Sequence, residues 1–472
     1  MSKVDFLILS GLCNDATNFN YTKDKIYSIT HRLLGPYKVA RQSRAAGYST
    51  QVIDFVQFMP DNVVIDLLDK LVDKNTLVSV SVSHLLYFDT APDTLMFKVQ
   101  SLVDYVKNKY QCKILIGGYN AALWKDFLRA DYILPNKCEN DIGPFLDKIK
   151  NNGIAKYRVP HYDITTCDFK WHERDFVQPN ETLPLETSRG CIFKCKFCGF
   201  ENLGKRPGTL IRDMSLIRDE LVENYERWGV TRYQLLDDTF NDDMIKVEQW
   251  ARMSQSLPFK LEYTAHLRGD LVQRHTDSAA MLVESGLRGC HLGVETLHKQ
   301  ASKAIAKPWS GTKAREWIPE IQKTTWKDVN VTVNIILGLP YEPLDSMYDT
   351  FYWAYKNKLS TVFYSYFIFP PDPTKDTTSH IEENYEEYGI RFTDTGWETD
   401  LTNNHETERL RDYFNLKIAQ ATVADSWDAN LFIGLGYTRE EVLAQPKKAL
   451  LDSPLYKQRL EMFIRKYVQS FG

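Results

Sequence analysis

Three cysteines stand close together near the middle of the chain, in the stretch ETSRGCIFKCKFCGF. Cys191, Cys195 and Cys198 form a Cys-x3-Cys-x2-Cys run. Thiolates are soft ligands, and three of them this close can bind three irons of one cubane iron–sulfur cluster. Because a four-iron cluster normally takes four thiolates, this run predicts a cluster with one iron left open to a ligand that the protein does not supply.

Zinc is the main alternative metal for such thiolates, and the spacing argues against it. A structural zinc site takes a fourth Cys or His in a paired pattern, whereas His161 and His172 lie upstream without such spacing. The other five cysteines are scattered: Cys13, Cys112, Cys138, Cys167 and Cys290. Cys112 and Cys290 lie in or beside apolar runs, so we expect them to be small core residues. No second cysteine cluster follows the first, and we expect no auxiliary cluster near the C-terminus.

The cysteine run, with the aromatic Phe197 directly before its third cysteine, resembles the signature of radical S-adenosylmethionine (SAM) enzymes. The resemblance implies a [4Fe-4S] cluster whose open iron chelates the amino and carboxylate groups of SAM. An electron from the reduced cluster then cleaves SAM to a 5′-deoxyadenosyl radical. The cofactor carries this chemistry, while the protein supplies position and exclusion of solvent. An electron donor such as flavodoxin or ferredoxin is implied as a partner.

Composition is that of an ordinary globular protein, with 472 residues, 43% hydrophobic and 25% charged. This length is enough for two or three domains. A net charge of −4 gives no polybasic signal for nucleic acid or membrane. The apolar stretch Phe6 to Leu9 is too short for the core of a signal peptide, and no stretch approaches the roughly 18 apolar residues of a membrane helix. An oxygen-sensitive cluster and isolated thiols together favour a cytoplasmic location.

Strand and helix signals alternate over residues 1–150, and this alternation predicts an α/β fold, a Rossmann-like doubly wound parallel sheet. The expected strands end at residues 10, 56, 83, 118 and 135. Ligands of such sheets bind beyond the carboxyl ends of the strands. The positions expected to face a ligand are therefore 11–14, 83–85 and 117–120.

This domain resembles the cobalamin-binding domain found before the core of the B12-binding radical SAM group. The matching stretches are AAGYSTQVIDF, VSVSVSH, ILIGGYN and ADYILPNKCEN. The last stands where that group often has a Gly-x-Gly-Glu turn, of which Glu139 is kept. The chain departs from the pattern in lacking an Asp-x-His-x-x-Gly motif, the usual source of a histidine ligand to cobalt. Cobalamin is thus implied as a cofactor, with a cofactor-free scaffold domain as the alternative.

The remaining chain divides into a polar linker, a second strand–helix domain and a charged, mainly helical C-terminal region. The expected boundaries are 151–182 for the linker, 183–375 for the radical SAM core and 376–472 for the C-terminal region. Six strand–helix units in the core predict a partial (β/α)6 barrel, open on one side. The first expected strand, 183–190, places the cysteine loop at its carboxyl end, where active sites of such barrels gather.

Two acidic residues, Asp237 and Asp238, end the second expected strand (230–242). The radical SAM family often has a Gly-Gly-Glu run near this position, which contacts the amino group of SAM, whereas the Asp-Asp-x-Phe variant here resembles the B12-binding group. A solvated loop or a helix N-cap is the alternative explanation for Asp238. The third strand (260–272) carries Arg268, which suits a carboxylate of SAM or substrate. An ion pair of Arg268 with a nearby acid such as Asp270 is the alternative.

The later strands carry two further expected contacts. Glu295 ends the fourth strand and resembles the family's acid that hydrogen-bonds the SAM ribose, since a carboxylate accepts two donors at once. Gly338 ends the fifth strand (329–343) in the manner of residues that flank the adenine. The sequence marks no residue as proton donor or radical quencher.

Taken together, the resemblance implies a radical SAM enzyme, most simply a cobalamin-dependent methyltransferase acting on an unactivated carbon of a small molecule or peptide. A cobalamin-free radical enzyme that performs a rearrangement, epimerisation or cyclisation is the second hypothesis. A non-enzymatic iron–sulfur redox or sensor module is the third, although such a module needs no SAM pocket.

Overall fold

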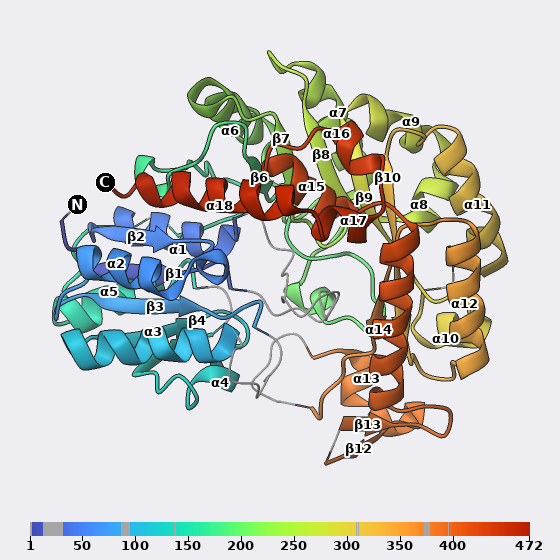
Figure 1. The fold of residues 1–472 in the computed structure, drawn as a ribbon, viewed down its shortest axis with the longest axis horizontal. Helices are drawn as coiled ribbons and strands as arrows, with labels where there is room; N and C mark the ends of the chain where they lie inside the picture. The colour runs from blue at the N-terminus through green and yellow to red at the C-terminus, as the bar shows by residue number, and fades with distance from the viewer. Residues whose placement is uncertain are drawn as a thin grey trace.

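The structure, a computed structural model, describes residues 2–12, 32–85, 95–135, 138–159, 161–307, 309, 311–371, 378–394 and 396–472. Cys13 and Asn14, singled out above, lie outside the described residues. Figure 1 shows an N-terminal α/β domain beside a larger strand–helix domain, with the red C-terminal helices running between and across them.

The N-terminal domain is a five-stranded parallel sheet in the order β2-β1-β3-β4-β5. Its strands are β1 (Phe6–Leu9), β2 (Thr50–Ile53), β3 (Leu77–Ser81), β4 (Lys113–Gly117) and β5 (Tyr132–Leu134). Its helices are α1 (Leu34–Ala45), α2 (Asp61–Leu71), α3 (Leu95–Tyr110), α4 (Ala121–Trp124) and α5 (Ile142–Lys150). The predicted doubly wound sheet is confirmed, and the strand order reverses between β1 and β3, where such sheets bind ligands.

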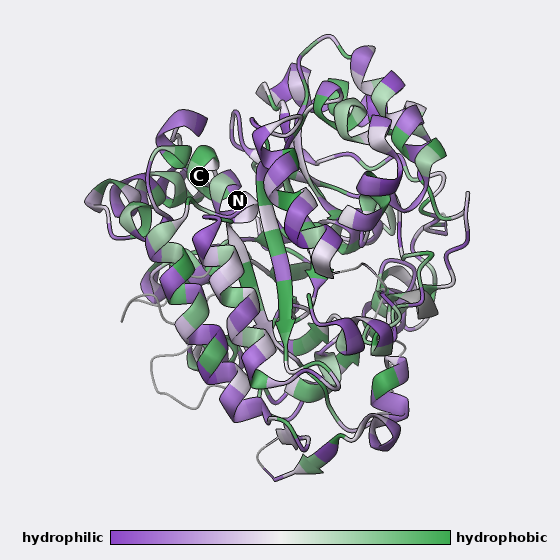
Figure 2. Ribbon diagram, turned by 90° about the vertical axis from the view of Figure 1, so that its right-hand side faces the viewer, coloured by the Kyte–Doolittle hydropathy of each residue, from purple (hydrophilic) through white to green (hydrophobic). Residues whose placement is uncertain are grey.

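Side chains that alternate along each strand build two separate cores on the two faces of this sheet. Phe6 and Ile8 point to one core, which includes residues of α1 and α5 and continues into the second domain. Leu7 and Leu9 point to the other core, which includes residues of α2, α3 and the C-terminal helix. Figure 2 shows the hydrophobic strands between helices whose outer faces are hydrophilic.

The second domain is a six-stranded parallel sheet in the order β11-β10-β9-β8-β7-β6, with β6 and β11 at its edges. Its strands are β6 (Thr182–Leu185), β7 (Arg232–Leu235), β8 (Glu262–Arg268), β9 (Leu287–Glu295), β10 (Asn330–Leu337) and β11 (Thr361–Ser365). Its helices are α6 (Met214–Trp228), α7 (Met244–Gln255), α8 (Gly269–Arg274), α9 (Thr276–Glu284), α10 (Lys299–Ala304), α11 (Gly311–Lys323) and α12 (Leu344–Lys356). This arrangement confirms the partial (β/α)6 barrel.

The first three barrel strands are shorter at their carboxyl ends than the sequence predicts. The strand expected over 183–190 ends at Leu185, and the one expected over 230–242 ends at Leu235. The third ends at Arg268, and Gly269 already begins α8. The polar residues that follow β6 and β7 hydrogen-bond one another across the end of the barrel instead of extending the strands.

The C-terminal region is mainly helical, as predicted, and also contains a short antiparallel hairpin that the sequence does not predict. Its elements are α13 (His380–Glu383), β12 (Arg391–Thr393), β13 (Gly396–Glu398), α14 (Asn404–Ala421), α15 (Ser426–Gly434), α16 (Arg439–Leu443), α17 (Lys447–Leu451) and α18 (Pro454–Gln469). Helix α14 covers the edge strand β11. Its Asn415 side chain accepts a hydrogen bond from the Phe363 N–H and donates one to the Phe363 carbonyl, which satisfies backbone groups of that edge.

Helix α18 returns to the N-terminal domain and completes the second of its two cores (Figure 1). Tyr467 and Phe471 are both fully buried in this core. The Tyr467 hydroxyl accepts a hydrogen bond from the Asp54 N–H, over a sequence separation of 413 residues. The two domains are therefore joined by the linker and also by the C-terminal helix.

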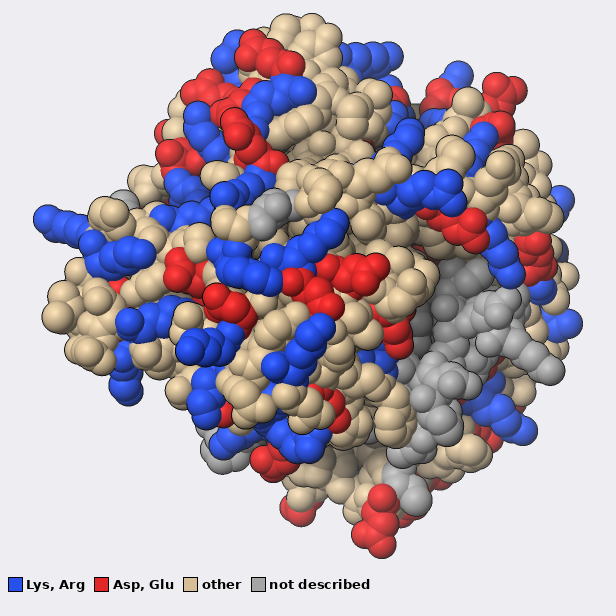
Figure 3. Space-filling view, turned by 60° about the vertical axis from the view of Figure 1, so that its left-hand side comes forward, with Lys and Arg blue, Asp and Glu red and all other residues tan. Residues whose placement is uncertain are grey.

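The linker is held by Arg32, whose side chain is fully buried. Its guanidinium donates two hydrogen bonds to Glu181, of 2.8 and 3.1 Å, and two more to the backbone carbonyls of Asp175 and Phe176. The face shown in Figure 3 carries basic and acidic side chains interspersed over the N-terminal domain. No helix among the described residues has the length and apolar character to cross a membrane.

Candidate active site

The three predicted cluster ligands lie on the loop that follows β6, at the carboxyl end of the barrel. Cys191, Cys195 and Cys198 are each partly exposed and none forms a disulfide. Cys191 Sγ lies 3.4 Å from the hydroxyl of Thr239, which follows β7. The loop thus presents its three thiols where the sequence analysis expects the site.

Arg268 lies over this loop from the end of β8. Its Nη1 atom is 3.6 Å from Cys195 Sγ, and its guanidinium stacks 3.9 Å from the ring centroid of Phe193. Its other nitrogens form a bidentate pair with Asp270, at 2.9 and 2.8 Å. The structure therefore has the ion pair that the sequence left open as an alternative, and it adds a contact with a cluster ligand.

The donor chemistry of the loop fits an iron–sulfur cluster. Burial raises the pKa of the Cys198 thiol to about 12, and burial also raises the pKa of Cys195 although Lys307 and Arg268 act in the opposite direction. Thiols of this kind release their protons on metal binding. Among the described residues, no three His, Cys, Asp or Glu side chains gather closely enough to hold a single metal ion, whereas a cubane takes one thiolate on each of three irons.

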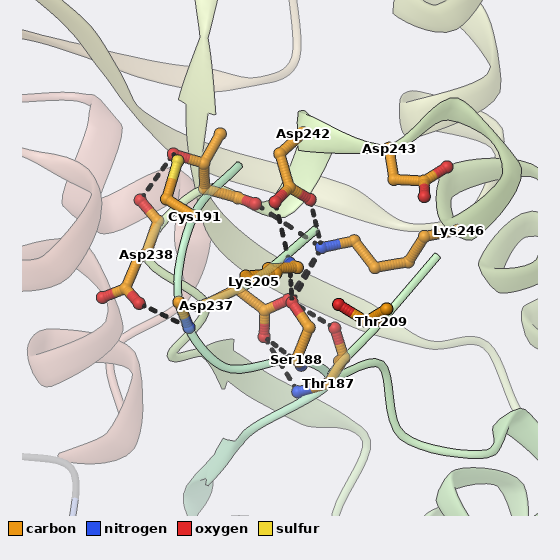
Figure 4. Close-up of polar contacts among 12 residues, drawn as sticks. Thr187, Ser188, Cys191, Lys205, Thr209, Asp237, Asp238, Asp242, Asp243 and Lys246 are labelled. Atoms are coloured by element: carbon orange, nitrogen blue, oxygen red, sulfur yellow. Dashed lines mark hydrogen bonds and ion pairs between the residues drawn. The ribbon is translucent and has the colours of Figure 1, made fainter. Parts of the chain in front are cut away.

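Asp237 is buried and holds the start of the cysteine loop (Figure 4). Its carboxylate accepts hydrogen bonds from the N–H and hydroxyl of Thr187, at 2.8 and 2.6 Å, and from the N–H and hydroxyl of Ser188, at 3.2 and 2.7 Å. Lys246 donates to Asp237 at 3.1 Å and to Asp242 at 3.0 Å. With these partners Asp237 positions the loop, while its predicted contact with SAM stays a prediction.

A second buried lysine completes this network. Lys205 forms an ion pair with Asp242 at 2.7 Å and donates a hydrogen bond to the Ser188 hydroxyl at 2.8 Å, and both charged side chains are fully buried. Two lysines and two aspartates thus balance in charge where unpaired charges would be costly. The sequence analysis missed both lysines, because lysine is almost never fully buried unless it is paired.

Asp238 points the other way from its neighbour and lines a cavity beside the loop. It accepts a hydrogen bond of 3.0 Å from the Gly190 N–H, directly before Cys191. Burial, and then the nearby charge of Asp237, raise the pKa of Asp238 to about 6. Asp238 therefore holds the backbone at Gly190 and also presents its side chain to the cavity. This position suits the predicted contact with the amino group of SAM.

Glu295 ends β9 with a buried ion pair. Its carboxylate accepts a 2.7 Å hydrogen bond from Lys307, another residue that the sequence analysis missed. Gly293 leaves room for this pair, since a Cβ there would lie 2.8 Å from both the Glu295 carboxylate and the Lys307 amine. The predicted ribose contact of Glu295 remains a prediction.

Two predicted cofactor contacts lie against the C-terminal half of the chain. Gly338 has a φ of +84°, and a Cβ at this position would lie 2.6 Å from the ring of Trp397 and 2.7 Å from Thr407. Phe197 is half-buried and packs against a hydrophobic cluster that includes Leu339 and Trp397. The structure thus brings Phe197 and Gly338 to one side of the site, and their contacts with SAM stay predictions.

A cavity of about 500 Å³ lies between the carboxyl ends of the two sheets. Its walls include residues that follow β3 and β4 of the N-terminal domain, namely Ser83, His84, Gly117, Gly118 and Tyr119. These are the strand ends where the sequence analysis expects a ligand. The barrel side includes Glu186, Ser188, Arg189, Asp238 and His266, so the cavity borders the cysteine loop.

One side of this cavity is closed by ion pairs between the domains. Arg189, two residues before Cys191, pairs with Glu139 of the N-terminal domain at 3.0 Å and with Glu186 at 2.8 Å. Lys38 of α1 also pairs with Glu186. Glu139, the one residue kept from the expected turn, therefore connects the N-terminal domain to the cysteine loop.

His266 and Trp427 form the wall of the cavity that lies inside the barrel. Their rings meet edge to face, with centroids 5.0 Å apart. Burial lowers the pKa of His266 to about 3, so its imidazole is neutral at physiological pH. Trp427 comes from α15, and no local pattern in the sequence connects it with a strand 160 residues earlier.

Comparison with known proteins gives a domain family and a fold. Residues 185–354 match the sequence model of the Radical SAM superfamily. The chain is also similar to the uncharacterized methyltransferase PH0819 of Pyrococcus horikoshii, with 23% identity over 207 residues, 43% of this chain and 42% of that protein. The chain therefore spans less than half the length of this curated relative.

Solved structures resemble the chain over most of its length. The radical SAM methyltransferase TsrM of Kitasatospora setae, bound to tryptophan substrate and a SAM analogue, superposes with a TM-score of 0.61 over 98% of this chain and 99% of TsrM, at 12% identity. The cobalamin-dependent SAM radical enzyme OxsB, bound to aqua-cobalamin and SAM, gives a TM-score of 0.51 over 99% of this chain and 72% of OxsB, at 13% identity. Residues 185–354 thus match a radical SAM domain, and the fold of the chain is similar to those of cobalamin-dependent radical SAM enzymes.

Proposed function

We propose that the protein is a cobalamin-dependent radical SAM methyltransferase that methylates an unactivated carbon. The observation that carries this proposal is the cavity of about 500 Å³, which joins the carboxyl ends of both sheets. Its wall includes residues on both sides of the three cysteines, namely Ser188, Arg189, Phe200 and Leu203. A ligand there would lie at the topological switch point of the N-terminal sheet and at the active face of the barrel at once.

At the carboxyl end of the barrel, different residues would bind different parts of the cofactors. Cys191, Cys195 and Cys198 would hold a [4Fe-4S] cluster, and Asp238 and Glu295 would accept hydrogen bonds from the amino group and ribose of SAM. Arg268, beside Cys195, would face the carboxylate of SAM. Cobalamin, when bound, supplies a cobalt that carries a methyl group, and the ion pairs at the cavity's side exclude water from it.

The methyl acceptor would lie against the barrel wall of the cavity. His266 offers a neutral imidazole for a hydrogen bond, and Trp427 offers an aromatic edge for a planar group. TsrM has been solved with a tryptophan substrate, and a small molecule or peptide side chain of that size fits this wall. We expect an electron donor such as flavodoxin or ferredoxin in the cytoplasm.

The second candidate is a cobalamin-free radical enzyme that performs a rearrangement, epimerisation or cyclisation. It shares the cysteine loop and the SAM contacts, and differs in leaving the N-terminal domain as a scaffold. The lack of an Asp-x-His-x-x-Gly motif favours this candidate. A sensor module would not cleave SAM, so reductive SAM cleavage by the reconstituted protein separates it from both enzymes.

The deciding experiment is anaerobic reconstitution with iron, sulfide and hydroxocobalamin, followed by desalting and an absorption spectrum. We expect four irons and one cobalamin per chain. The matched control is Ser81→Trp, which fills the cavity from the end of β3 in the N-terminal domain and should keep the iron while losing cobalamin. Wild-type protein with four irons and no cobalamin would contradict the proposal and favour the second candidate.

Glu295→Gln is expected to weaken SAM binding about 10-fold or more, because a hydrogen bond to a charged group contributes about 1.5–3 kcal/mol. Isothermal titration of SAM onto reconstituted protein measures the affinity, and iron analysis checks that the cluster is intact. The matched control is Glu248→Gln, on the exposed face of α7. Unchanged affinity in Glu295→Gln would remove the ribose assignment.

A further inference from the structure

His84 lies beside the point where the strand order of the N-terminal sheet reverses, which is where sheets of this kind bind ligands. It lies three residues after the end of β3, which neighbours β1 at the switch point. His84 is exposed and lines the cavity between the two sheets. It is therefore accessible to a ligand bound in that cavity.

The backbone on both sides of His84 is fixed by hydrogen bonds. The Val82 N–H donates to the Gly117 carbonyl at 3.0 Å, and the Leu85 N–H donates to the Val82 carbonyl at 3.0 Å. Leu85 is fully buried, and its carbonyl accepts a 2.8 Å hydrogen bond from the indole of Trp124. His84 thus projects from an anchored turn.

The loop between β4 and α4 secures the same turn from the neighbouring strand end. Asn120 donates to the Ser83 carbonyl at 3.0 Å, and Gly118 brings the two loops into contact. A Cβ at Gly118 would lie 2.2 Å from the Ser83 hydroxyl. This rigidity is what a metal ligand needs, since its position is then set before the metal binds.

The barrel wall and the sheet wall of the cavity carry different functional residues. The barrel wall carries Asp238 and residues that flank the three cysteines, so the reactive face of a bound cobalt would be the one toward the barrel. The opposite face looks toward the N-terminal sheet. Among the described residues that line the cavity, His84 is the imidazole on the sheet side and His266 is the imidazole on the barrel side. Imidazole binds iron and nickel, and cobalt lies between these two metals in the order of affinity for nitrogen ligands.

We propose that the imidazole of His84 is the axial ligand, on the sheet side, to the cobalt of a cobalamin held in this cavity. This inference rests on the proposed function, and it names a ligand at a strand end different from that of the missing Asp-x-His-x-x-Gly motif. The ligand would leave the barrel-facing side of the cobalt open for the methyl group.

The test is electron paramagnetic resonance of the protein loaded with cobalamin and reduced to the cobalt(II) form. An axial nitrogen splits the cobalt lines into triplets when it is nitrogen-14 and into doublets when it is nitrogen-15. Protein labelled with nitrogen-15 histidine is therefore expected to give doublets. His84→Ala in the same labelled protein should lose them, and adding unlabelled imidazole should produce triplets. The matched control, His266→Ala, should keep the doublets.

Each other outcome overturns the inference. Triplets in the labelled wild-type protein would mean that the cofactor's own base binds the cobalt, and unsplit lines would mean that no nitrogen does. Doublets that persist in His84→Ala would assign another histidine. These results leave the proposed function standing, because cobalamin is bound in all of them. Wild-type protein that retains no cobalamin would overturn both.

Discussion

Replacing Cys191, Cys195 and Cys198 together with alanine will abolish both iron binding and SAM cleavage. The three thiols share one loop at the carboxyl end of β6, and each would hold one iron of a cubane. Loss of all three removes every protein ligand that the site offers, so nothing is left to retain the cluster through desalting. Iron and sulfide analysis, an absorption spectrum and chromatography of 5′-deoxyadenosine measure the two losses.

Two buried cysteines provide matched controls for this result. Cys112 is 2% exposed and Cys290 is fully buried, and burial raises the pKa of both thiols. Cys112→Ala and Cys290→Ala should leave the iron content unchanged. Cys13→Ala, outside the described residues, should do the same. A four-iron spectrum in the triple variant would end the radical SAM assignment of this loop, and iron loss in a control would reveal a missed ligand.

Lys246→Met will destabilise the protein by about 3–5 kcal/mol, because removing one partner of a buried ion pair leaves the other charge uncompensated. Lys246 is fully buried and binds both Asp237 and Asp242. Since Asp237 also holds the start of the cysteine loop, the variant should lose its cluster at a lower urea concentration than the wild-type protein does. Urea unfolding followed by fluorescence, with iron absorbance recorded in parallel, measures both effects.

The control for Lys246→Met is Arg391→Ala in the β12–β13 hairpin. Arg391 pairs with Glu398 on the surface, where both side chains are about half exposed, so the expected loss is much smaller than that of Lys246→Met, because solvent screens such pairs. A double variant, Lys246→Met with Asp237→Asn, should recover part of the stability by removing the orphaned charge. A loss from Lys246→Met no larger than that of Arg391→Ala would show that the buried network does not hold this end of the barrel.

The sequence predicts well those features that depend on short stretches of neighbouring residues. The cysteine spacing fixes the loop, and the alternating strand and helix signals fix both sheets. The carboxyl ends of the first three barrel strands are predicted too long. The sequence pattern places polar residues such as Asp237 at the end of a strand, whereas in the structure their side chains hydrogen-bond the neighbouring loop.

The sequence does not predict which residues far apart in the chain contact one another. From the sequence alone, Lys205 and Lys246 are expected to lie on the surface. Only the spacing of Asp242 and Lys246, one helical turn apart, indicates an ion pair. The sequence places His84 among the positions expected to face a ligand, at 83–85, but no local pattern marks its imidazole as a metal ligand. Trp427 enters the site from the C-terminal region, which carries no motif.

Helix α18 has a consequence for how the protein is made. Tyr467 from α18 and Phe471, which follows this helix, belong to the core of a domain whose strands are translated first. During synthesis, therefore, the part of this core that these residues cover stays exposed after α2 and α3 have covered the rest of that face of the sheet. Removing α18 and the residues after it would leave this apolar surface exposed and the chain prone to aggregation, despite an intact cysteine loop.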